Sequence, residues 1–285
     1  MSGYLLSLVP LVGVNVVLAV GLNVVVGFCG QISLGQAAFY GLGAYVAGLL
    51  ALAGLPVLGT LPLAALAAGT AGLAVGLVSL RVREDFLAVT TIAVGFLFLG
   101  TIRKSPLFGG EIGLSGIPAT GLGPEGLAVL VVALAAAVIA LSLYMKASWL
   151  GFAFAAVAED EEAARTIAIP VSSYKLAAFF VGSTMSGLAG ALYCAYARFI
   201  TPDTFGFVVS VSILAMTVIG GLGSTWGAVA GASLLTLLPE MLRFAGEYRQ
   251  LVFGALIVLV IRFAPGGLAG ALADLVARRR KSGAA

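Results

Sequence analysis

The densest group of side chains that could do chemistry is an acidic run in the second half of the chain. Its members are Glu159, Asp160, Glu161 and Glu162, and Arg165 follows four residues after Glu161. Residues four apart share one face of a helix, so Glu161 and Arg165 can form an ion pair that supports a helix by roughly a few tenths of a kcal/mol. Residues 152–168 are good helix formers, and Pro170 is expected to end the segment.

The same segment predicts a docking surface rather than a catalytic one. Val157, Ala164, Ile167 and Ala168 fall close to helical spacing on one side of it. A short amphipathic helix of this kind suits a groove on a soluble partner. The alternative is a helix lying in lipid headgroups, which the acidic face disfavours because anionic lipids attract basic faces.

Motifs of the common catalytic and metal sites are missing from the sequence. It contains no histidine, no GxxxxGK[ST] loop, no HExxH and no GxSxG. The two cysteines, Cys29 and Cys194, lie in or beside apolar runs and form no CxxC pair. We therefore expect no enzyme activity, no ATP site, no metal and no cofactor of the chain's own.

Two glycine-rich interruptions of the apolar runs are the candidates for a solute path. One covers residues 27–35 and the other residues 220–227, and each has a GxxG followed by a small polar residue and another glycine. Glycine-broken helices in two halves of a transporter mark a substrate path, although small residues also allow close helix packing. The candidate pathway residues are Gly30, Gln31, Ser33, Gln36, Gly220, Gly223 and Ser224.

Strongly polar side chains are scarce in the first 80 residues. They are Asn15, Asn23, Gln31 and Gln36, which can either line a path or hydrogen-bond between helices. No acidic residue falls at a predicted bilayer centre, which argues against a proton-driven carrier. An ion-coupled secondary transporter of a small neutral or zwitterionic solute stays open, because backbone carbonyls can hold the ion.

The elements that must position these residues are membrane helices. Hydrophobic residues make up 61% of the chain and charged residues 9%, against roughly 25% charged in soluble domains. No side-chain charge precedes Arg81, and helices satisfy their own backbone hydrogen bonds in lipid. We predict one all-α transmembrane domain over residues 1–285 with about nine crossings, at 4–26, 33–54, 57–80, 85–102, 125–146, 174–197, 206–219, 225–238 and 248–264.

Basic residues predict the orientation of this bundle. The cluster Arg278, Arg279, Arg280 and Lys281 lies in a tail, 271–285, that follows the last predicted crossing. The positive-inside rule places this tail and the connector 147–173 in the cytoplasm, and nine crossings then place the N-terminus outside. The net charge of +3 shows no basic stripe suited to nucleic acid.

Several long blocks of the sequence resemble one transporter family. They are GLNVVVGFCGQISLGQAAFYGLGAYVAGLL (21–50), LRVREDFLAVTTIAVGF (80–96), GGEIGLSGIP (109–118), and the segments 158–193, 201–232 and 263–270. In this order they are similar to the LivM/LivH permease subunits of branched-chain amino acid importers driven by ATP. The resemblance covers nearly the whole chain.

The resemblance implies a bacterial inner-membrane permease that moves a branched-chain or other apolar amino acid inward. A second permease, two cytoplasmic ATPases that bind the ATP, and an extracytoplasmic solute-binding protein would be its partners. The residues carried over to ATPase coupling are Glu159, Asp160, Glu161, Ala164, Arg165, Ile167 and Ile169. Similar permeases serve amides, urea or aromatic acids, so the resemblance leaves the substrate open.

Three positions depart from the family's pattern in the coupling segment. The family often has an arginine shortly after the loop glycine, where Phe152 follows Gly151 here. Ala158 replaces a basic residue before the acidic pair, and Ala168 replaces a common glycine. The docking surface is therefore less basic than is usual.

Overall fold

The computed structural model describes residues 2–82 and 84–241, together with Gly254, Arg262, Gly267, Leu268 and Gly270. These residues form helices and no named strand; an isolated bridge joins Leu114 to Ile200. The helices are α1 (Ser2–Leu22), α2 (Gln36–Leu52), α3 (Val57–Ser79), α4 (Glu84–Lys104), α5 (Gly123–Ala147), α6 (Trp149–Glu159), α7 (Glu161–Thr166), α8 (Val171–Ala197), α9 (Phe207–Gly220) and α10 (Thr225–Met241). A π-helix (Asn23–Phe28) extends α1, and short 3₁₀ turns cover Pro106–Phe108 and Pro202–Phe205.

The all-α membrane bundle predicted from the composition is confirmed. Six helical stretches of the described chain are long and apolar enough to cross a membrane, while α2, α6 and α10 are shorter apolar helices. The expected count of nine crossings is not confirmed. The crossing predicted at 248–264 lies almost wholly outside the described residues, and the tail 271–285 lies entirely outside them.

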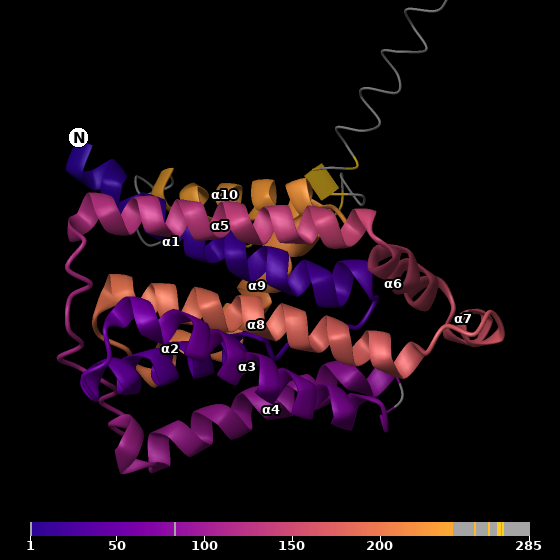
Figure 1. Cartoon of the computed structure of the whole chain (residues 1–285), viewed down its shortest axis with the longest axis horizontal. Coiled ribbons are helices and arrows are strands. Elements are labelled where there is room, and N and C mark those ends of the chain that lie inside the picture. Colours follow the sequence, from indigo (N-terminus) through magenta and orange to yellow (C-terminus); the bar gives the residue numbers. More distant parts are fainter. Residues whose placement is uncertain are drawn as a thin grey trace, which may run out of the picture.

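The bundle has two distinct ends, which Figure 1 shows at its left and right. The pair α6 and α7 lies at the right end, beyond the tips of the long helices. The start of α1 and the segment between α4 and α5 lie at the left end. This arrangement puts the acidic run and the beginning of the chain at opposite ends of the molecule.

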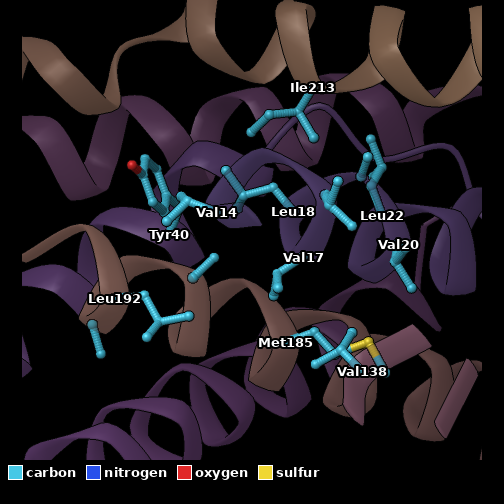
Figure 2. Packing of buried hydrophobic residues seen from close by; sticks show 14 of the residues in the cluster. Val14, Val17, Leu18, Val20, Leu22, Tyr40, Val138, Met185, Leu192 and Ile213 are labelled. Carbon is cyan, nitrogen blue, oxygen red and sulfur yellow. The ribbon is translucent and has the colours of Figure 1, made fainter. Parts of the chain in front are cut away.

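Helix α8 is the centre of the packing, with α1, α2 and α3 all against it. Figure 2 shows Val17 of α1 beside Met185 of α8, and Leu18 of α1 on the side of Ile213 of α9. All four side chains are almost completely buried. Because lipid is as apolar as these residues, close packing rather than the hydrophobic effect holds such helices together.

Glycines bring α2 and α8 into backbone contact. A Cβ at Gly43 would overlap the backbone of Gly187, and a Cβ at Gly190 would overlap the carbonyl oxygen of Tyr40. Small residues at membrane helix crossings permit this close approach. The two helices therefore lie too close together for a larger side chain at either position.

Replacing Gly190 with alanine is expected to separate α2 from α8. The added methyl group has no space against Tyr40, so we expect the free energy of unfolding to fall by about 1–3 kcal/mol. Titration of the purified protein with a denaturing detergent measures it. The matched control is Gly95→Ala on α4, where a Cβ meets nothing within 4 Å; equal stability of both variants would contradict the packing described.

Candidate functional site

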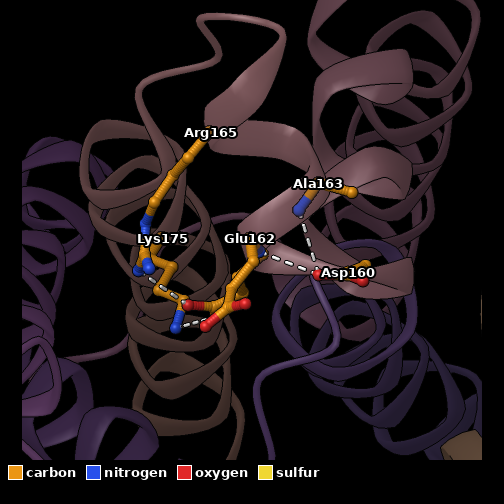
Figure 3. A network of polar contacts seen from close by, with 6 residues as sticks. Asp160, Glu162, Ala163, Arg165 and Lys175 are labelled. Atoms are coloured by element: carbon orange, nitrogen blue, oxygen red, sulfur yellow. Dashed lines mark hydrogen bonds and ion pairs between the residues drawn. The ribbon is translucent and has the colours of Figure 1, made fainter.

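The acidic run forms a break between two helices, so the single helix expected over 152–168 is wrong. Asp160 has an extended backbone (φ −161°, ψ 112°), and its side chain accepts hydrogen bonds from the backbone N–H groups of Glu162 (2.8 Å) and Ala163 (3.1 Å). An aspartate favours this N-cap position because its carboxylate satisfies N–H groups that lack helical partners. The cap ends α6 and starts α7, as Figure 3 shows.

An ion-pair cluster ties α7 to the bundle. One carboxylate oxygen of Glu161 contacts the Lys175 ammonium of α8, and the other lies 3.3 Å from the Arg165 guanidinium. The side chains of Lys175 and Glu161 are only 9% and 17% exposed. The Glu161–Arg165 pair confirms the expected i, i+4 contact. The contact with Lys175 is the stronger link because both of its charges are shielded from water.

The outward side of this end carries large apolar side chains. Ile167 is 67% exposed, Trp149 73% and Phe152 68%. Ala164 and Val157 instead face inward and are buried. An exposed apolar surface beside charged residues is typical of a protein or lipid contact.

The remaining residues predicted for coupling divide between these two sides. Glu159, Asp160 and Arg165 are exposed. Ile169 is half-buried and packs against the main core. Their place at one end of the bundle is clear, while their role in coupling stays a prediction.

Ala168 has a left-handed backbone (φ +62°) just after α7. Residues with a Cβ are strained in this conformation by roughly 1–2 kcal/mol. Glycine avoids the strain, but it loses part of this gain because its unfolded chain has more conformational freedom. We expect Ala168→Gly to stabilise α7 by roughly 0.5–1 kcal/mol. Hydrogen exchange of the amides of residues 161–167 should then slow, whereas Ala163→Gly inside the helix should speed it up. Faster exchange in the first variant would contradict this.

The first glycine break lies beside α6. The chain leaves the π-helix at Cys29, and Gly30 takes a left-handed conformation (φ +71°) against Ala158. Gln31, one residue later, is buried with 4% exposure. The break therefore touches the segment that carries the acidic run.

The second glycine break packs directly on the first. Asn23 accepts a hydrogen bond from the backbone N–H of Gly223 (2.9 Å), and Lys146 donates one to the Gly223 carbonyl (2.6 Å). Gly27 leaves no space for a side chain between them. The two breaks, about two hundred residues apart in sequence, thus meet at the α6 end of the bundle.

The other pathway candidates have mixed surroundings. Gly220 packs on Gly227, and Ser224 accepts a hydrogen bond from the Gly227 N–H (3.1 Å). Ser33 is buried, and its hydroxyl has no hydrogen-bond partner among the described residues. The seven residues do not form one cluster, and their part in transport stays a prediction.

Three of the four early amides form contacts between helices. Asn15 donates to the Thr236 hydroxyl (2.9 Å), Gln36 donates to the Ser186 hydroxyl, and Asn23 binds Gly223. The side chain of Gln31 makes no hydrogen bond to any residue that the structure describes. Helix contact therefore accounts for the first three and leaves Gln31 without an explanation.

A polar cavity of about 640 Å³ lies between α7 and the bundle. It is bounded by the first glycine break, the end of α3, the α6–α7 turn and the start of α8. Its lining residues include Cys29, Gly30, Gln31, Ser79, Glu161, Arg165 and Lys175. The cavity therefore connects one candidate path element with the acidic run.

Sequence reasoning missed Lys175 as a member of the site. The available signal was its position, since it is the one cation within the apolar run of α8 before Arg198. A cation at a helix end close to four carboxylates is a candidate partner for one of them.

The family model described as "Branched-chain amino acid transport system / permease component" matches residues 4–261. The chain belongs to this family. The LivM permease proteins of the high-affinity branched-chain amino acid transport systems of Salmonella typhimurium and Escherichia coli K12 are each 32% identical to it over 286 residues. Each alignment covers 90% of this chain and 67% of the relative.

A second, more distant group of relatives supports the same assignment. The LivH permease protein of Escherichia coli K12 is 30% identical over 136 residues, which cover 47% of this chain and 44% of LivH. No solved structure matches the chain. The resemblance drawn from the sequence blocks is thus confirmed: this member of the permease family is a multi-pass, all-α membrane protein.

Proposed function

We propose that this family member is the membrane permease subunit of an ATP-binding-cassette importer, and that it carries a branched-chain or other apolar amino acid inward. The ATP is bound and hydrolysed by partner subunits. The observation that carries the proposal is the exposed α6–α7 pair joined through Glu161 and Lys175 to α8. A transport subunit driven from outside needs a surface of this kind, linked to its membrane helices.

The coupling step follows from this linkage. The ATPase binds the exposed side of α7, where Ile167 projects, and its closure on ATP displaces α7. The Glu161–Lys175 pair transmits the displacement to α8, and the tight glycine contacts transmit it to α2. ATP can shift the permease between inward-open and outward-open states only if its affinity for the ATPase subunits is higher in one of these two states.

We propose that the α6–α7 end lies in the cytoplasm and the start of α1 outside. Arg81, Lys146, Arg165 and Lys175 belong to the cytoplasmic end in this arrangement, while Arg103, Lys104 and Arg198 lie at the other end. The positive-inside rule supports this direction. It also puts the docking surface where ATP is available.

The substrate is proposed from chemistry and family together. The relatives are named for branched-chain amino acid transport. In the described chain no charged residue lies in the central part of a long apolar helix, which suits a zwitterion or neutral solute better than a permanent ion. The assembly we propose has a second permease, two ATPases and an extracytoplasmic solute-binding protein.

Reconstitution tests the proposal. The complex purified through this chain is placed in liposomes with ATP on the ATPase side and radiolabelled leucine, with solute-binding protein, on the other. The proposal expects leucine uptake that needs ATP and stops when the ATPase is poisoned. Uptake driven by a proton or sodium gradient without ATP would overturn it in favour of an ion-coupled carrier.

A further inference from the structure

The cavity behind α7 has the size and walls of a ligand site. Its volume of about 640 Å³ falls in the usual range for small-molecule pockets. The outward residues of α7, Thr166 and Ile167, are not among its lining residues. Ile167, the proposed apolar anchor for the ATPase, therefore lies outside the cavity, whereas the coupling candidates Glu159, Asp160, Glu161 and Arg165 line it.

The amide side chain of Gln31 in the cavity wall is available to a ligand. Gln31 lines the cavity, and only 4% of its surface is exposed. Its side-chain amide has no hydrogen-bond partner among the described residues, whereas Asn15 and Gln36 donate to hydroxyl groups and the Asn23 oxygen accepts from Gly223. The amide atoms of Gln31 are not fully enclosed, so they stay accessible from the cavity and can hydrogen-bond a polar group that enters it.

The charges of the wall favour an ammonium group together with a carboxylate. Four acidic residues (Glu159, Asp160, Glu161, Glu162) and two basic ones (Arg165, Lys175) line the cavity, which gives 2 − 4 = −2. Asp160 caps α7, and Glu161 holds both cations. Glu159 and Glu162 form no ion pair with the described residues, are exposed, and line the cavity. They are the partners available to an ammonium group.

Part of the remaining wall is aliphatic. Leu80, Val82, Val157 and Val171 line the cavity, and Val157 and Val171 are buried. Such side chains accept an aliphatic group of a ligand and remove it from water. Polar, acidic and aliphatic surfaces thus surround a single space.

We propose that this cavity binds a free aliphatic amino acid from the α7 side of the membrane. The ammonium group lies at Glu159 and Glu162, the carboxylate at the Gln31 amide and Lys175, and the side chain on the Leu80–Val157 wall. The proposal rests on the proposed function, because it makes the cavity a site for the transported product. A bound amino acid contacts both α7 and the first glycine break, so accumulated product slows the transport cycle.

The test is direct binding to the whole importer in lipid nanodiscs, without ATP and without solute-binding protein. The probe is radiolabelled leucine, competed by isoamylamine, which lacks the carboxylate, and by 4-methylpentanoate, which lacks the ammonium group. We expect saturable leucine binding, weaker competition by the amine and the weakest by the acid. Gln31→Leu should weaken leucine binding roughly tenfold, while the control Thr166→Val on the outer side of α7 should not.

A second measurement keeps the test decisive if Gln31→Leu fails to fold. In a chain with Cys29→Ser and Cys194→Ser, the exposed cavity residue Ser172 is changed to cysteine and labelled with a maleimide. Leucine should slow this labelling. Absence of saturable binding, or binding that neither protects Ser172→Cys nor responds to Gln31→Leu, overturns the inference. If ATP-driven uptake occurs without such binding, the cavity site is wrong and the importer proposal stands. If leucine binds without ATP-driven uptake, the importer proposal is wrong and the cavity site stands.

Discussion

Replacing Lys175 with methionine is expected to abolish most leucine uptake while the partner ATPases continue to hydrolyse ATP. Removing one partner of a shielded ion pair weakens the balance of the other charge, and Glu161 then keeps its contact with Arg165 at 3.3 Å. The link from α7 to α8 is lost, so ATP hydrolysis no longer moves the bundle. Loss of about 1.4 kcal/mol of coupling already lowers the uptake per ATP by roughly tenfold.

The matched tests separate coupling from folding. Glu161→Lys combined with Lys175→Glu restores the pair with exchanged charges and should recover part of the uptake that each single change removes. Lys104→Met, an exposed lysine at the other end of the bundle, should leave the uptake per ATP unchanged. Normal coupling in Lys175→Met would show that α7 reaches the bundle by another contact.

Ile167→Asp is expected to release the ATPase from the permease. The side chain is 67% exposed on the outer side of α7, and a central apolar anchor in an interface contributes about 2 kcal/mol or more. A carboxylate there also meets the acid-rich surface of its own segment. The ATPase should therefore bind roughly thirtyfold more weakly, measured by how much of it remains with the purified permease during dilution.

The chain supplies its own control for this variant. Ile112 is 78% exposed in the segment between α4 and α5, at the end opposite α7. Ile112→Asp makes the same chemical change without touching the proposed docking surface, so ATPase retention should match the unmodified chain. If both variants lose the ATPase equally, or if neither variant loses it, docking on α7 would be contradicted.

Helix positions could be predicted because apolar runs and glycines mark them directly. The predicted crossings 57–80 and 125–146 correspond to α3 (Val57–Ser79) and α5 (Gly123–Ala147). The Glu161–Arg165 pair was also predictable, since it depends only on the spacing within one helix. Local chemistry was enough for these features.

Features that depend on the turn between elements could not be predicted. Helix propensity favoured one helix over 152–168, but the capping bonds of Asp160 divide it. The partnership of Glu161 with Lys175 depends on how the chain turns through Ala168 (φ +62°) before α8. The contact of Gly27 with Gly223 joins residues from opposite ends of the sequence. Tertiary packing alone brings these pairs together.

The most direct test of the central claim is to purify the chain from its native membrane and identify the co-purifying chains by mass spectrometry. We predict ATPase subunits and a second permease with the unmodified chain, and loss of the ATPases with Glu161→Lys combined with Arg165→Glu. Recovery of the chain alone, still able to transport leucine on an ion gradient, would contradict the importer account.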